Sequence, residues 1–455
     1  MSGPLRPLAK APRPYAFPQA QRARLGNGLT VYVVPLRRLP VATALLMSDA
    51  GAECDAPESA GTASLTVDAQ TEGTSERDGV ALADAFEQLG GSIDTAATWA
   101  HSEVSTTVTA GRFAGALSLL AEVTRSPSFP KSEVSRLREE RMSELLQQRT
   151  EPRGLADDMF ARVCFATSSR YATPEGGVEQ TVATVSRESV VRHHHRHVVP
   201  ERSTLIVVGD LEVDAVMQLA EHALGGWSGA GTETPDIMVA PLHPNRVVHV
   251  VSKPDSPQSE LRVGHLSVGR RHPDFHAISV MNAILGGLFN SRINLNLREE
   301  HAYTYGAFSH FEWRRQASSF ETSTAVRSDA TAAAVREILG EIDRMQNELV
   351  SPAELSLALD YLTGVFPIRF ETTAAIADAI ASREGYSLPS DYFDRYRDQI
   401  ASVTAEDVLR VAQRHLTPDR IQVVAVGDAT IVRAELEALK IGPVLLYDAT
   451  GERTA

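Results

Sequence analysis

Two stretches of the chain, SVVRHHHRHVVPERSTLIVVGD (189–210) and DVLRVAQRHLTPDRIQVVAVGD (407–428), align without a gap over 22 positions. The offset is 218 residues throughout, so that His197 falls on His415 and Pro200 on Pro418. Each copy has apolar residues at helical spacing, a turn that contains proline, and a run of β-branched residues that ends in Gly-Asp. Each copy therefore predicts a helix, a strand and the start of another helix, and the chain is an internal duplication.

The repeat extends more faintly beyond these stretches, because SLLAEVTRSPSF (118–129) resembles EILGEIDRMQNEL (337–349). Strand pairs such as LTVYVVP and VATALLMSDAG alternate with long helical patterns over 112–125 and 131–149. This mixture predicts an α+β fold with a mainly antiparallel sheet and helices packed on one face of each domain. The expected divisions are an extended arm (1–21), a first domain (22–228), a linker rich in Gly, Pro and Thr (229–246), and a second domain (247–455).

The composition is that of a globular protein of more than one domain, with 455 residues, 43% hydrophobic and 22% charged. A net charge of −14 argues against nucleic acid or an anionic membrane as the main partner. Two cysteines, Cys54 and Cys164, cannot build a disulfide framework or a cysteine-type zinc site. The basic, proline-rich first residues lack the apolar centre of a secretory signal, and no apolar run is long enough for a membrane span. We therefore expect a cytoplasmic protein.

The tract RHHHRH (192–197) has the composition of a metal-binding segment. Its three central histidines are replaced in the second copy by Val411, Ala412 and Gln413, so the fold does not need them. Consecutive helix residues also point in different directions and cannot all ligate one ion. We predict a surface helix here rather than a metal site. The other histidines considered are expected to be ordinary strand or surface residues: His101, His301 and His310.

The stretch AGTASLTVDAQTEGT (60–74) reads as a helix that begins with small residues, has an apolar lining and ends in Gly-Thr. No residue in its centre can hold a metal well or transfer a proton. A helix without reactive groups is expected to persist here because the core of the domain needs its apolar side.

The chain as a whole resembles the pitrilysin/insulinase family of zinc peptidases, from about residue 22 to residue 435. The resemblance rests on the order and spacing of several landmarks together with the two strands that end in VGD. These landmarks are LGNGLTVYVVP (25–35), EQLGGSIDTAATWAHSEVST (87–106) and TPEGGVEQTVATVSRESV (173–190). The resemblance implies two homologous domains arranged as one half of a clamshell.

The family's catalytic helix carries His-x-x-Glu-His, in which two imidazoles one turn apart bind zinc and the Glu is the base for the zinc-bound water. On this pattern the first His maps to Ser64, the Glu to Val67 and the second His to Asp68, with Gly73-Thr74 setting the register. The family's third ligand, a Glu, maps to Glu144, which is retained. The resemblance thus implies no zinc in this chain, and at most a weak two-carboxylate site for a hard cation at Asp68 and Glu144.

The stretch LGGLFNSRINLNLREEHAYTYG (285–306) resembles the family's substrate-binding motif, in which a Gly-rich turn precedes an Arg and a Tyr seven residues apart. Here these residues are Gly286-Gly287, Arg298 and Tyr305, with Tyr303 as a rival for the Tyr position. The resemblance implies that the Arg binds the substrate backbone and the Tyr hydroxyl stabilises the oxyanion. A guanidinium fork and a phenol are suitable donors for those two tasks.

A chain with the oxyanion-binding residues and no zinc ligands resembles the zinc-free subunit of the bacterial heterodimers in this family. The implied partner is a homologous subunit that carries His-x-x-Glu-His and zinc, and the implied substrate is a peptide or unfolded protein. The segment from Ser92 to Thr106 resembles the family's peptide-pairing edge strand. Two alternatives remain open: a scaffold similar to the core subunits of the respiratory bc1 complex, and a self-sufficient peptidase with an unusual metal site at Asp68 and Glu144. Nothing supplies a general base for the second alternative.

Overall fold

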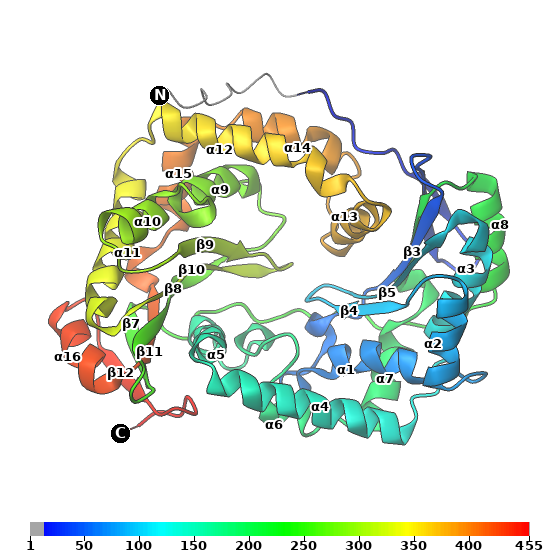
Figure 1. Ribbon diagram of the computed structural model, residues 1–455, viewed down its shortest axis with the longest axis horizontal. Coiled ribbons are helices and arrows are strands. Elements are labelled where there is room, and N and C mark those ends of the chain that lie inside the picture. The colour runs from blue at the N-terminus through cyan, green and yellow to red at the C-terminus, as the bar shows by residue number, and fades with distance from the viewer. Residues whose placement is uncertain (1–12, 455) are drawn as a thin grey trace, which may run out of the picture.

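The computed structural model describes residues 13–454, and Figure 1 shows its two halves lying side by side. Each half contributes one six-stranded sheet, with strand orders β1-β2-β6-β3-β5-β4 and β12-β7-β11-β8-β10-β9. Most of the expected N-terminal arm, up to residue 12, lies outside the described residues, and the first strand begins at Gln21.

The strands of the two sheets repeat one pairing pattern. In the first sheet β2 runs parallel to β6, and β3 runs antiparallel to β5 and β6. In the second sheet β7 runs parallel to β11, and β8 runs antiparallel to β10 and β11. The two sheets differ only in the strand at one end, since β1 is antiparallel to β2 whereas β12 is parallel to β7. The mainly antiparallel α+β fold predicted from the repeat is confirmed.

The bounds of the strands are β1 Gln21–Arg24, β2 Thr30–Pro35, β3 Val41–Ser48, β4 Asp94–Ala97, β5 Ser102–Thr109, β6 Ser203–Gly209, β7 Val247–Ser252, β8 Gln258–Val268, β9 Ala307–Glu312, β10 Ala317–Arg327, β11 Gln422–Gly427 and β12 Val444–Tyr447. The helices of the first half are α1 Thr62–Ala69, α2 Gly79–Gln88, α3 Phe113–Arg125, α4 Lys131–Thr150, α5 Pro152–Cys164, α6 Glu179–Val182, α7 Arg187–His197 and α8 Val213–Leu224. Those of the second half are α9 Phe275–Asn282, α10 Arg292–Asn294, α11 Thr331–Asn347, α12 Pro352–Val365, α13 Thr373–Gly385, α14 Tyr392–Ala401, α15 Ala405–His415 and α16 Ala429–Ala438.

Each sheet has a face covered by helices of its own half, as expected. On the first sheet, α2, α3 and α8 bury residues such as Phe86, Leu120 and Val216 against β2, β3 and β6. The opposite face of each sheet is covered by a helix from the other half. α13 brings Ile376 and Ile380 onto β3 and β6, and α5 packs on β8 and β11 of the second sheet. The two halves therefore share their cores.

The histidine tract on α7 has one face inside the first half, so the predicted surface helix is wrong for three of its four histidines. His193, His194 and His197 are buried, and the first two bond backbone carbonyls through Nε2 at 3.2 and 2.9 Å. The physical reason is visible in the repeat, because the counterparts of His193 and His194 are Val411 and Ala412, which are fully buried core residues of α15. Burial lowers the pKa of both histidines to about 4.

Candidate functional site

The segment between α9 and β9 carries Arg298 and Tyr305 and has an irregular backbone. α9 continues into a π-helical turn at Ala283–Gly287, and α10 continues into a second one at Leu295–Glu300, which contains Arg298. π-Helical turns occur frequently at functional sites. Ala302, just beyond the second turn, has a φ of 52°, a left-handed conformation that is strained for a residue with a side chain. The chain thus departs from regular α-helix before Arg298, at Arg298 itself, and between Arg298 and Tyr305.

Of the two candidate tyrosines, Tyr305 is by far the more exposed. Tyr305 is 94% exposed, whereas Tyr303 is half-buried and stacks on His301 with ring centroids 5.0 Å apart. The backbone N–H of Tyr303 also donates to the carbonyl of Leu297, and the carbonyl of Tyr303 accepts from the N–H of Arg327. The position of Tyr303 is therefore that of a packing residue, and the phenol available to a ligand is that of Tyr305.

Arg298 lies at the surface with part of its hydrogen-bonding capacity free. Its guanidinium stacks over the ring of Phe289 at 4.5 Å, and its nearest carboxylate is that of Glu299 at 3.5 Å. Phe289 is itself exposed. Stacking orients a guanidinium while leaving its in-plane N–H donors for a carbonyl or carboxylate.

Buried polar side chains brace the backbone on both sides of Tyr305. Asn294 donates through Nδ2 to the carbonyl of Phe289 at 2.7 Å and accepts through Oδ1 from the N–H of Ala307 at 2.9 Å. The hydroxyl of Thr324 on β10 lies 3.0 Å from both the hydroxyl of Thr304 and the carbonyl of Gly306. Because Tyr305 has no side-chain hydrogen bond among the described residues, these backbone contacts set where its ring stands.

The glycine pair before this segment has two different environments. Gly286 is buried, and a Cβ there would lie 2.4 Å from the hydroxyl of Ser309 on β9. Asn282 bonds the same serine through both its amide nitrogen and its amide oxygen. Gly286 therefore permits the close approach of the π-helical turn to β9, while Gly287 is exposed.

In the first half, the helix that corresponds to the catalytic helix is α1, and its reactive positions are filled by unreactive groups. Val67 is buried in the core beneath the sheet, as its apolar character predicts. Asp68 is partly buried, accepts a hydrogen bond from the hydroxyl of Thr95 at 3.1 Å, and has its pKa raised by burial. Glu144 on α4 is exposed and pairs with Arg141 at 3.0 Å. Ser64 offers only a hydroxyl.

These residues do not fit a catalytic zinc ion. Zinc sites of peptidases use three strong nitrogen, sulfur or carboxylate ligands, and a zinc-bound water needs a base beside it. Here one ligand position holds a serine, the base position holds a buried valine, and one carboxylate is already paired with a guanidinium. No step of a hydrolytic reaction can be assigned to the α1–α4 site of this chain.

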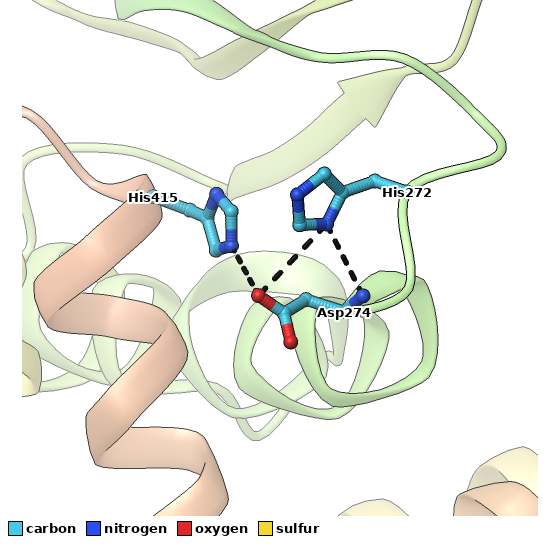
Figure 2. Close-up of side chains that lie close together, drawn as sticks. All are labelled: His272, Asp274 and His415. Carbon is cyan, nitrogen blue, oxygen red and sulfur yellow. Dashed lines mark hydrogen bonds and ion pairs between the residues drawn. The ribbon is translucent and has the colours of Figure 1, made fainter.

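A cluster that sequence reasoning missed lies in the second half, where His272, Asp274 and His415 place three possible ligand atoms within 4.8 Å of one another. Figure 2 shows both imidazoles turned toward the carboxylate of Asp274, which meets Nε2 of His415 at 2.7 Å. The same carboxylate forms ion pairs with Arg410 at 2.8 Å and with Arg414 at 3.6 Å. Two guanidiniums and the N-terminal end of α9 already balance its charge, which disfavours a divalent cation. The cluster fastens α15 to α9, and the pairing of His415 with His197 in the repeat was the only signal for it.

Two family sequence models match this chain. The model described as "Insulinase (Peptidase family M16)" matches residues 36–170, and the model described as "Peptidase M16 inactive domain" matches residues 184–362. The chain belongs to peptidase family M16. The family resemblance inferred from the order and spacing of the sequence landmarks is thereby confirmed, and this M16 chain lacks the family's zinc motif on α1.

Relatives of this M16 chain have different described roles. An uncharacterized zinc protease of Mycobacterium tuberculosis is 22% identical over 416 residues, covering 91% of this chain and 94% of the relative. A probable mitochondrial-processing peptidase subunit beta of Schizosaccharomyces pombe is 24% identical over 441 residues, covering 90% and 92%. Subunit 1 of the cytochrome b-c1 complex of Bos taurus is 26% identical over 274 residues, covering 60% and 56%.

The fold is shared with solved structures. A peptidase M16 inactive domain from Pseudomonas fluorescens superposes with a TM-score of 0.83 at 24% identity, covering 90% of this chain and 98% of that one. No helix among residues 13–454 is long and apolar enough to cross a membrane.

Proposed function

We propose that this M16 chain is the zinc-free subunit of a heterodimeric zinc peptidase. A homologous partner that carries His-x-x-Glu-His would supply the zinc and the attacking water. Arg298 would bind the backbone of the substrate peptide, and the hydroxyl of Tyr305 would donate to the oxyanion that forms when the partner's zinc-bound water attacks. The observation that carries the proposal is the 94% exposed phenol of Tyr305, held on a braced corner beside Arg298, in a chain whose own α1 has no reactive groups.

Exposure of this kind is costly unless it serves a ligand. Large aromatic side chains contribute most when buried, and Tyr305, Phe289 and Phe308 are all exposed in the segment from 289 to 308. A peptide or a partner chain seated over Arg298 would cover them. α10, which leads into Arg298, belongs to the half of the chain opposite α1 and α4 (Figure 1), and α1 carries no zinc motif, so zinc that faces the pair would come from a second chain.

The first sheet also offers a place for an extended peptide. β4 lies at the end of this sheet next to α1, pairs only with β5, and its outer edge makes no backbone hydrogen bond among the described residues. Its counterpart β9 has part of its outer edge covered by the side chains of Asn294 and Asn282. We infer that β4 docks part of the substrate by strand addition.

The test is to purify the chain alone and in its native complex and to follow cleavage of a fluorogenic peptide. The chain alone should cleave nothing, with or without added zinc. In the complex, Tyr305→Phe should lower turnover by about 10²-fold, the usual effect of one oxyanion donor. Tyr361→Phe, which alters an exposed tyrosine on α12, is the matched control and should leave turnover unchanged. If the complex keeps its full turnover after substitution of both Arg298 and Tyr305, the proposed role of these residues in trans is excluded.

The second candidate is a structural subunit without a part in catalysis. It is favoured by the similarity to subunit 1 of the b-c1 complex, at 26% identity over 274 residues. A structural subunit would co-purify with partners that contain no zinc, and metal analysis of each chain in the native complex separates the two candidates.

A further inference from the structure

Arg141 occupies a place on α4 that bears directly on the degenerate metal site. It precedes Glu144 by three residues, so both side chains emerge from the same face of the helix. Its Nη1 donates to Oε2 of Glu144 at 3.0 Å, and its Nε donates to the carbonyl of Gly176 at 3.3 Å. The guanidinium is thus held from two sides.

Gly176 is shaped to receive this guanidinium. A Cβ at position 176 would lie 2.4 Å from Nη2 of Arg141 and 3.0 Å from its Cζ. Residues with a side chain would therefore displace the guanidinium, and glycine leaves the room that it fills. In this conformation the guanidinium of Arg141 thus fills room that the glycine leaves.

The carboxylate of Asp68 lies in the field of the same guanidinium. Burial raises the pKa of Asp68, the charge of Arg141 acts to lower it, and the negative charges of Glu144 and Glu72 act to raise it. Asp68 and Glu144 occupy two of the positions at which the family's pattern places zinc ligands, and here Arg141 is paired with Glu144 while its charge also acts on Asp68. A guanidinium paired with one of these carboxylates supplies positive charge at the place where a cation would.

We propose that Arg141 is the built-in cation of the degenerate site, and that it closes the site to metal even when the motif is restored. Replacing Ser64, Val67 and Asp68 with the family's His, Glu and His would return the ligands but leave a fixed positive charge beside the dication. Zinc binding would then require the loss of Arg141 as well. This inference does not depend on the role of Arg298 and Tyr305 in trans, and its test measures metal binding by one chain.

The experiment compares three full-length variants, each first shown to be folded by circular dichroism. One carries Ser64→His, Val67→Glu and Asp68→His; the second adds Arg141→Met, which keeps an unbranched side chain without charge. The third adds Arg138→Met to the same triple change instead, one turn earlier on α4, where Arg138 bonds the carbonyl of Val185. Zinc affinity is measured by competition with a chromophoric chelator, and zinc content by mass spectrometry after dialysis.

We expect Arg141→Met to raise zinc affinity by roughly tenfold or more and Arg138→Met to leave it nearly unchanged, since Coulomb repulsion falls with distance. Equal affinity with and without Arg141 overturns the proposal. An equal gain from Arg138→Met also overturns it, because net charge alone would then explain the effect.

A single substitution keeps the proposal testable if the restored helix does not fold. In the natural sequence, Arg141→Met leaves Asp68 and Glu144 without their positive neighbour. Calcium should then raise the melting temperature of this variant while leaving that of the natural chain unchanged, because carboxylates suit a hard cation. A variant indifferent to calcium contradicts the assignment.

Discussion

The side-chain oxygen of Asn294 accepts a hydrogen bond from the N–H of Ala307 at 2.9 Å, closing the segment that carries Arg298 and Tyr305. Its amide nitrogen holds the carbonyl of Phe289 on the other side of the same segment. One buried asparagine therefore joins the two ends of the candidate site. The strength of this brace can be measured without knowing the partner.

Asn294→Ala should destabilise the chain by roughly 1–3 kcal/mol, because the N–H of Ala307 is left buried without an acceptor. Urea unfolding followed by circular dichroism measures the change. Asn290→Ala is the control, since Asn290 is exposed in the same segment and makes no side-chain hydrogen bond among the described residues. If both variants lose a comparable amount of stability, the side-chain hydrogen bonds of Asn294 do not stabilise this segment.

Acid should weaken the first half through its buried histidines. Burial lowers the pKa of His193 and His194 to about 4, against about 6.5 in the unfolded chain. Between these values the unfolded state binds more protons than the folded state, so stability falls as the pH drops from about 6.5 to about 4, by roughly 3 kcal/mol for each histidine. Melting temperatures recorded across this range measure the slope.

Exchanging residues between the repeats isolates this effect. His193→Val with His194→Ala copies Val411 and Ala412 and should reduce the acid slope, while other buried histidines such as His197 and His265, whose pKa burial also lowers to about 4, keep part of it. His195→Gln copies the exposed counterpart Gln413 and should leave the slope as it is. If the double variant keeps the natural slope, the acid sensitivity has another source.

Arg262 should be sensitive to substitution because it is buried among carboxylates. It bonds Asp157 on α5 at 2.6 Å, Glu260 at 2.9 Å and Glu321 at 3.3 Å, which ties a helix of one half to the sheet of the other. Arg262→Met should cost roughly 3–5 kcal/mol, the usual effect of breaking a buried ion pair from one side.

The pH dependence identifies the cause of that loss. Burial raises the pKa of Glu321 to about 8, and removing Arg262 withdraws the charge that opposes this rise. Below about pH 8 Glu321 holds its proton in both the natural fold and the variant, whereas above that pH only the variant keeps it, so the deficit should grow as the pH rises above about 8. Adding Glu321→Gln should recover part of the stability at pH 8, and a deficit independent of pH would argue for lost packing instead.

The two halves should remain together after the chain between them is cut. α5 and α13 each cover the sheet of the opposite half and bury side chains such as Ile376 and Ile380 there. A protease site placed in the stretch 229–234, where most residues are exposed, should yield two fragments that co-elute in size-exclusion chromatography. The fragment 1–228 expressed alone should aggregate, because the face of its sheet that receives α13 would be uncovered. Fragments that separate and stay soluble would show two independent domains.

The sequence by itself determined the duplication, the strand and helix content of each copy and the missing zinc motif. These are local properties: β-branched runs, helical spacing and turn residues act over a few neighbours, and Val67 cannot become a base in any fold. Sequence reasoning also selected Tyr305 over Tyr303 by spacing, and the structure leaves only Tyr305 exposed.

Only the tertiary structure decided which residues far apart in the chain meet. Three features depend on packing between segments up to hundreds of residues apart. They are the packing of α5 and α13 on the sheets of the opposite halves, the burial of His193 and His194, and the hydrogen bond between Asp274 and His415. No local pattern encodes such contacts, because helix and strand periodicity says which face is apolar but not what covers it. The seat of Arg141 on Gly176 is of the same kind, since a glycine 35 residues away makes the room that the guanidinium fills.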